Sequence, residues 1–204
     1  MPNCIYNPQS VADELFRVIK ASRLTGSVRA VLLTTPDRQH ALSLIRKTVL
    51  ECECPLYHFT VAGRRRYDAG KHRWEREGGE ANQPPELLRC AGDLRNGGVV
   101  VLEDLAPFLR DEGGDLQMRM TLAQMLAAED PRPSLVLIFV EPPGAENRLP
   151  ATLADQFVRL EVPYPRAEEL EFIAKQELAA ACHRAQIEAE ADWIKQQAQR
   201  LATG

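Results

Sequence analysis

The residues best suited to chemistry follow one apolar segment of the chain. Two glycines and four apolar residues at positions 97–102 lead directly into Glu103 and Asp104. An apolar run of this kind predicts a strand buried on both faces of a parallel sheet, and such sheets bind their ligands at the carboxyl edge. Two carboxylates at that edge offer the oxygen ligands that Mg²⁺ prefers. Glu103 and Asp104 are therefore the first candidate site residues.

A site that hydrolyses a nucleotide must also hold the phosphates. The usual device is a loop of the pattern G-x-x-x-x-G-K-[ST], whose backbone N–H groups and lysine surround them. The chain has no such loop, because the apolar segment 28–33 that should precede it runs into Thr34-Thr35-Pro36-Asp37-Arg38. We therefore expect Glu103 and Asp104 to be solvated or capping residues at a strand end. A residual divalent-cation site and hydrolysis by the carboxylate pair are the less favoured alternatives.

The cysteines and histidines show no site spacing. The five cysteines are scattered, and the one close pair, Cys52 and Cys54, could be joined by Cys90, but the spacing is not that of a zinc knuckle. None of the four histidines has a partner at ligand spacing, and none is placed to assist the two acids. We predict no metal site, no cofactor and no catalytic residue. Scattered, unpaired cysteines also favour a reduced, cytoplasmic protein.

A basic stretch at residues 63–76 is the second candidate. It sets six Lys and Arg residues and two aromatics against two acids. Cations interleaved with aromatic rings suit the phosphates and bases of single-stranded nucleic acid, and they equally suit an acidic protein surface. A solvated loop without a ligand is the third alternative. The candidate partner-binding residues are Arg64, Arg65, Arg66, Tyr67, Lys71, Arg73, Trp74 and Arg76.

Composition favours one α/β domain with a small appendage. The chain has 204 residues, of which 45% are apolar and 26% charged, and its formal net charge is −4. This acidic balance argues against a protein that coats nucleic acid and leaves room for a local basic patch. No apolar segment approaches the ~20 residues of a membrane-spanning helix, so no membrane partner is expected.

Hydrophobic periodicity alternates between strands and helices up to about Pro165. Strands are expected at 28–33, 56–61, 97–102, 135–140 and 157–162. The polar segment 62–84 is expected to be a loop. One helix is expected to bury a stripe formed by Leu116, Met120, Ala123 and Leu126–Ala127. The predicted fold class is α/β, with a doubly wound, mostly parallel sheet of five strands.

Beyond Pro165 the periodicity is helical only. Glu168, Glu169 and Glu171 begin one helix, and a second carries the apolar stripe Ile187, Ala191, Ile194, Ala198 and Leu201 with Trp193 beside it. Two short helices cannot bury such stripes alone. We therefore divide the chain into an α/β domain at 1–165 and an incomplete helical domain, a partial lid, at 166–204.

The segment from Gly97 to about Phe172 resembles the core of an AAA-type ATPase module. The resemblance rests on the acid-ended (Walker B-like) strand, the strand at 135–140, and the sequences Leu149-Pro150-Ala151-Thr152-Leu153 and Val162-Pro163-Tyr164-Pro165. The last of these is similar to the V-P-x-P sequence at which the small helical domain of the family begins. The chain is most similar to the degenerate first module of a conserved cyanobacterial and plastid-encoded AAA protein, in which an intact ATPase module follows. The resemblance implies an AAA fold with a P-loop-like core.

Four parts of the AAA machinery depart from that resemblance. The phosphate loop is absent, and the acids stand in the order Glu103-Asp104 where the family has Asp-Glu. The sensor-1 asparagine expected near Val140–Glu141 is missing. The arginine-finger position falls in Ala154-Asp155-Gln156-Phe157, and the nearby Arg148 and Arg159 are out of register.

These departures predict a pseudo-ATPase, an AAA-like module that does not hydrolyse nucleotide. We expect it to act as an assembly and partner-binding domain that docks on active AAA ATPase subunits or on a following ATPase module. The first alternative is a nucleic-acid-associated accessory subunit, similar to the non-hydrolysing subunits of clamp loaders. The second is an active AAA ATPase with an atypical phosphate loop.

Overall fold

The architecture comes from a computed structural model of the chain. The structure describes residues 8–77, 83–127, 134–145, 149–164, 170–171, 174–175, 178, 182 and 191–203. Contacts within the chain divide it into two compact units, Met1–Pro163 and Tyr164–Gly204. The candidate site residues all lie in the first unit.

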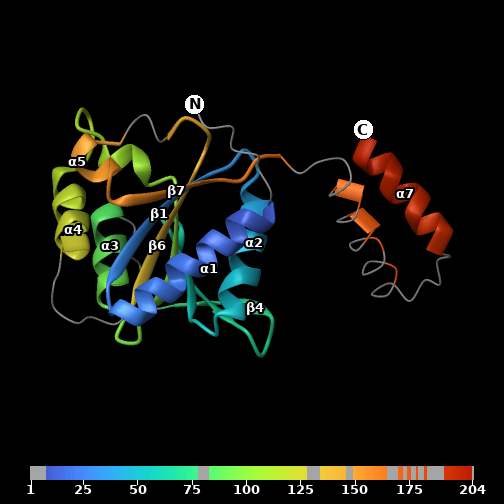
Figure 1. Ribbon diagram of the computed structural model, residues 1–204, viewed down its shortest axis with the longest axis horizontal. Helices are drawn as coiled ribbons and strands as arrows, with labels where there is room; N and C mark the ends of the chain where they lie inside the picture. Colours follow the sequence, from blue (N-terminus) through green and yellow to red (C-terminus); the bar gives the residue numbers. More distant parts are fainter. Residues whose placement is uncertain are drawn as a thin grey trace. The chain divides into compact units, whose positions relative to one another are not determined.

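The first unit is one sheet with helices on both faces (Figure 1). Its strands are β1 (Val28–Thr34), β2 (Leu56–Thr60), β3 (Gly63–Asp68), β4 (Arg73–Arg76), β5 (Gly98–Glu103), β6 (Leu135–Glu141) and β7 (Phe157–Glu161). Its helices are α1 (Pro8–Thr25), α2 (Arg38–Glu51), α3 (Pro84–Gly92), the 3-10 helix η1 (Ala106–Leu109), α4 (Leu116–Ala127) and α5 (Ala151–Ala154). The strands lie in the order β4-β3-β2-β5-β6-β1-β7.

The five expected strands are all present, and they pair with one another in parallel. Their carboxyl ends therefore meet at one edge of the sheet, where ligands of open α/β sheets bind. The predicted α/β class with a doubly wound, mostly parallel sheet is confirmed.

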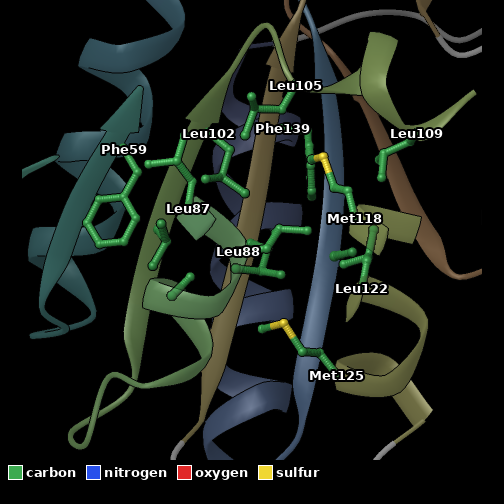
Figure 2. Packing of buried hydrophobic residues seen from close by; sticks show 14 of the residues in the cluster. Phe59, Leu87, Leu88, Leu102, Leu105, Leu109, Met118, Leu122, Met125 and Phe139 are labelled. Carbon is green, nitrogen blue, oxygen red and sulfur yellow. The ribbon is translucent and has the colours of Figure 1, made fainter. Parts of the chain in front are cut away.

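Two apolar layers fix the helices on the sheet. On one face Leu15 and Ile19 of α1 and Ile45 of α2 are buried against the strands. On the other face the core combines Leu102 of β5 and Phe139 of β6 with side chains of α3, η1 and α4 (Figure 2). The helix residues are Leu87, Leu88, Leu109, Met118, Leu122 and Met125. Each fully buried side chain of this size stabilises the fold by roughly 1.5–3 kcal/mol, so packing rather than helix propensity holds these layers together.

The segment 62–84, expected to be a loop, is instead an antiparallel hairpin for most of its described length. β3 pairs with β2, and β4 pairs with β3, so the sheet has seven strands rather than five. Tyr67 and Trp74 alternate with charged residues, which is the pattern of a half-buried strand. The density of charge hides this alternation in the sequence. We name residues 63–76 the basic hairpin.

The expected apolar stripe of α4 is buried only in part, because Ala123 and Leu126 pack against the core but the rest of the stripe does not. Leu116 and Met120 are 63% and 54% exposed, whereas Met118, Leu122 and Met125 are buried. Both sets are apolar at helical spacing, so periodicity alone does not separate them. The side chain of Asp115 accepts the N–H of Met118 at 2.9 Å and starts the helix, and the packing against α3 then selects the second set.

In the second unit the structure describes one long helix, α7 (Ala191–Thr203). Ala198 is buried and Trp193 is 47% exposed. The expected residues Ile187, Glu168 and Glu169 lie outside the described residues, as does Arg148 in the first unit. Within the part of the chain that the structure describes, no helix has the length and hydropathy needed to span a membrane.

Candidate functional site

The carboxyl ends of three central strands bring four chemically active side chains together. The parallel register places Glu103 of β5 opposite Val140 of β6, and Glu141 of β6 opposite Thr34 of β1. Asp104 follows β5, and it adopts a left-handed backbone conformation with φ of 56°. Arg38, the first residue of α2, reaches this edge from beyond β1. We call Arg38, Glu103, Asp104 and Glu141 the edge cluster.

Asp104 is held by a two-pronged ion pair rather than left to solvent. The Arg38 Nη1 lies 2.6 Å from Asp104 Oδ2, and Nη2 lies 2.5 Å from Asp104 Oδ1. The same guanidinium lies 4.0 Å from Glu103 Oε2. Both partners of the Arg38–Asp104 pair are about half exposed, so water screens their attraction and the pair contributes at most ~1 kcal/mol to stability. Its main consequence is chemical, because it neutralises one of the two carboxylates that were considered as cation ligands.

Glu103 has a second partner, His58, at the middle of β2. The His58 Nε2 and Glu103 Oε1 are 2.8 Å apart, and each side chain is only 16% exposed. The hydrogen bond to His58 lowers the pKa of Glu103 below its usual range, although burial opposes the shift. Glu103 is therefore a bound carboxylate, and the expectation that no histidine stands near the two acids was wrong. Chain positions 58 and 103 are far apart in sequence, and only the pairing of β2 with β5 brings them together.

Glu141 is a buried acid at the same edge. Its side chain is 1% exposed, and its Oε1 accepts the backbone N–H of Ala106 at 2.7 Å. Burial raises the pKa of Glu141 to about 7, and the negative charge of Asp104 adds to the rise, while the N–H of Ala106 and the charge of Arg38 oppose it. Glu141 therefore carries a proton for part of the time at neutral pH, unlike Glu103 beside it.

The connection from β1 to α2 occupies the place of a phosphate loop, but it is only three residues long, Thr35 to Asp37. Free N–H groups at a helix start bind phosphate well. Here the Oδ1 of Asp37 accepts the N–H of His40 at 3.0 Å, and Thr35 Oγ1 accepts the N–H of Asp37 at 3.1 Å. The start of α2 is thus already capped by the chain's own carboxylate, which would repel a phosphate.

This cap gives a direct prediction for stability. Asp37→Ala removes the acceptor for the N–H of His40, so we expect the free energy of unfolding to fall by about 1 kcal/mol. Asp37→Asn keeps a side-chain oxygen and should retain most of that stability. Urea denaturation of the three proteins measures the difference, and equal midpoints would show that the cap contributes nothing.

The two aromatic residues of the basic hairpin are not open stacking surfaces. Tyr67 is 8% exposed, and its ring centroid lies 5.2 Å from that of Trp74. Trp74 also lies 5.5 Å from the ring of His58, and the guanidinium of Arg46 in α2 covers Tyr67 at 5.7 Å. These rings pack on the sheet and fix the hairpin to it.

The cations of the hairpin fall into three groups. Lys71 bonds to Glu75 at 2.9 Å and to Asp68 at 3.3 Å, and Arg73 bonds to Glu75 at 3.0 Å. The guanidinium groups of Arg64 and Arg66 lie 5.9 Å from the rings of Phe59 and Tyr57. Arg65 and Arg76 are exposed, and within the described residues neither guanidinium forms a hydrogen bond or ion pair.

Three cysteines of the first unit lie on different faces of the sheet. Cys52 and Cys54 pack in the layer below α1 and α2, whereas Cys90 packs in the opposite layer. Burial raises the pKa of the Cys52 thiol, which makes it a poor metal ligand. Among the residues that the structure describes, no group of three or more His, Cys, Asp and Glu side chains is arranged to hold a metal ion.

With this geometry in place, comparison with known proteins identifies the family. The sequence matches the family model described as the N-terminal domain of SpoVK-like AAA ATPases over residues 13–162. The chain belongs to this family. No curated protein matches the sequence significantly.

Solved structures show the same fold for the SpoVK-like domain. Three structures of RuvB from Thermotoga maritima, each with a different single substitution, match it with TM-scores of 0.57, 0.57 and 0.56 at 14%, 16% and 17% identity. They cover 94%, 96% and 96% of this chain. The chain spans only 56%, 60% and 59% of those RuvB chains. At such identities the likeness concerns the fold alone, which is that of an AAA+ core.

Three residues at or beside this edge of the SpoVK-like domain were not expected from the sequence: Arg38, His58 and Glu141. Arg38 and Glu141 had a usable signal, because residues that directly follow parallel strands, or begin the next helix, share the carboxyl edge. His58 had none, because its approach to Glu103 depends on which strands are neighbours.

Proposed function

We propose that this SpoVK-like domain is a pseudo-ATPase, a non-hydrolysing AAA module that acts in assembly and partner binding. The observation that carries the proposal is the Arg38–Asp104 pair, with both guanidinium nitrogens within 2.6 Å of the carboxylate. The chain supplies its own cation where Mg²⁺ would lie, and Asp37 caps the helix start where phosphate would lie. A nucleotide must displace both contacts, and it finds no lysine or glycine-rich loop to replace them.

The isolated domain is therefore expected not to bind Mg·ATP at millimolar concentration. Isothermal titration calorimetry should give no saturable heat, and the melting temperature should not rise with nucleotide, since only a ligand that binds the folded state raises it. Arg38→Ala serves as the control that tests the ion pair separately. It should also fail to bind, because the phosphate loop is still missing. Micromolar binding that Glu103→Gln or Asp104→Asn abolishes would overturn the pseudo-ATPase proposal.

The proposed partners are active AAA ATPase subunits or an ATPase module that follows the domain. The matched family model describes an N-terminal domain of AAA ATPases, which supports a role beside an ATPase module. The resemblance to the degenerate first module of the cyanobacterial and plastid-encoded protein has the same implication. Co-purification from the native host should recover an AAA protein with an intact phosphate loop. Recovery of partners without any AAA module would contradict this assignment.

A role as a nucleic-acid-associated accessory subunit is the second candidate function. The exposed Arg65, Arg66 and Arg76 favour it, because a guanidinium binds phosphate well. Single-stranded bases, however, also need open aromatic faces, and Tyr67 and Trp74 pack on each other and on the sheet. The arrangement of the basic hairpin therefore favours a protein partner.

A further inference from the structure

β4 lies at one end of the sheet order, with β3 on its only paired side in the part of the chain that the structure describes (Figure 1). An edge strand of this kind presents a row of backbone N–H and C=O groups that another extended chain can use. The backbone pairing of β4 with β3 determines which of its residues present these groups and which side chains lie beside them.

The hydrogen bonds between β3 and β4 show which backbone groups of β4 point toward the open edge. The N–H of Glu77 donates to the carbonyl of Arg64 at 2.9 Å, so these two residues form a hydrogen-bonded pair of the antiparallel ladder. Such pairs alternate with pairs whose backbone groups point away from each other. The register pairs Arg76 with Arg65 and Trp74 with Tyr67. The N–H and C=O groups of Trp74 and Arg76 therefore point toward the open edge.

The same register also places two arginines directly opposite each other on one face of the hairpin. Arg65 and Arg76 face each other as a pair without backbone hydrogen bonds, which is the arrangement with the closest side chains. Like charges placed directly opposite each other destabilise a sheet. Neither guanidinium has a carboxylate partner among the described residues, whereas Lys71 and Arg73 both do. A carboxylate from outside would relieve this repulsion.

Extending the partner-binding role proposed above, we propose that β4 is a docking edge that takes up an extended acidic segment of a partner protein as an additional strand. The backbone of the segment pairs with Trp74 and Arg76. Its residue opposite Arg76 is acidic and meets the Arg65–Arg76 pair, and its residue opposite Trp74 is apolar and packs on the indole. Backbone bonds supply affinity in this mode of recognition, and alternate side chains supply specificity. A second copy of β4 carries the same arginines, so charge favours an acidic segment over self-pairing.

A synthetic peptide tests this edge without nucleotide, so its outcome is independent of the pseudo-ATPase proposal. The probe is a fluorescein-labelled heptapeptide, Thr-Asp-Thr-Val-Thr-Asp-Thr, whose symmetry allows either strand direction. Fluorescence anisotropy measures its affinity, and amide shifts in ¹H–¹⁵N NMR spectra locate its site. We expect saturable binding with the largest shifts at the amides of Trp74 and Arg76.

Three changes separate charge from backbone pairing. Arg76→Glu should weaken binding by at least about tenfold, the loss expected for a hydrogen bond to a charged group. Arg95→Glu makes the same charge change at an exposed residue outside the basic hairpin and is the matched control, with little loss expected. A peptide N-methylated at every residue from its first Asp to its second keeps its charge but cannot pair in either direction, so it should bind at least about tenfold more weakly, because its backbone hydrogen bonds are lost.

Several results would overturn the docking edge. These are no saturable binding at millimolar peptide, equal binding of a peptide with lysine in place of aspartate, and equal binding of the N-methylated peptide. Competition by a single-stranded oligonucleotide that binds more tightly than the peptide would assign the surface to nucleic acid instead. If Arg76→Glu lowers the melting temperature, Arg76→Ala replaces it, since it removes the charge without adding an acid.

Discussion

Gly98→Ala is expected to lower the free energy of unfolding by more than about 3 kcal/mol, the range of the most damaging core substitutions. Gly98 begins β5 with φ of +127°, a conformation that side chains rarely adopt. An added Cβ would lie 2.7 Å from the carbonyl oxygen of Pro55 and 3.3 Å from the ring of Tyr57. That carbonyl cannot simply move away, because it accepts the N–H of Val99 at 2.9 Å. Relieving the clash therefore breaks the pairing that positions Glu103 and Asp104.

Gly113→Ala separates backbone strain from this clash. Gly113 also has a positive φ, +74°, but nothing lies within 4 Å of its added Cβ. The free energy of unfolding should fall only by the ~1–2 kcal/mol that a left-handed backbone conformation costs a residue with a Cβ. Chemical denaturation of both variants gives the comparison. Equal losses would show that close packing of β5 against Pro55 is not what requires glycine at position 98.

Glu141→Gln is expected to stabilise the domain above neutral pH and to have little effect near pH 5. Burial raises the pKa of Glu141 to about 7, well above the ordinary value of 4.5. Between these two values the folded state binds more protons than the unfolded state, so the free energy of unfolding falls as pH rises. The loss is complete above the folded pKa and amounts to roughly 3 kcal/mol. Glutamine has no charge to bury and can still accept the N–H of Ala106, so it avoids this loss.

Urea denaturation at several pH values between 5 and 8.5 measures the effect. The difference between Glu141→Gln and the unsubstituted protein should grow by about 1–3 kcal/mol across that range. Glu161→Gln removes an exposed acid at the end of β7 and controls for the loss of one negative charge. Parallel stability curves for the Glu141→Gln and unsubstituted proteins would mean that Glu141 is not a buried titrating acid.

The five parallel strands and the edge at which Glu103 and Asp104 lie followed from the sequence alone. Apolar runs such as 135–140 are long enough to require burial on both faces, and that requirement forces parallel pairing under helices. The absence of a phosphate loop was also visible in the sequence, because it is a property of residues that follow one another along the chain.

Tertiary structure decided everything that depends on which segments become neighbours. The basic hairpin joins the sheet because Tyr67 and Trp74 pack in the apolar layer that also contains residues of α2. The charged residues beside these two rings had hidden the alternation of aromatic and charged residues in the sequence. The buried face of α4 was chosen by its packing against α3, since two faces were equally apolar in sequence.

The chemistry of the candidate site was likewise decided by contacts between distant residues. The sequence contained Glu103, Asp104 and Arg38, but only the strand order β2-β5-β6-β1 brings His58 to Glu103 and Arg38 to Asp104. Charges interact over a few ångströms of space and not along the sequence, so partners 45 and 66 positions apart leave no periodic signal. The sequence determined that this domain has acids at the sheet edge, and the fold determined that its own arginine and histidine contact them.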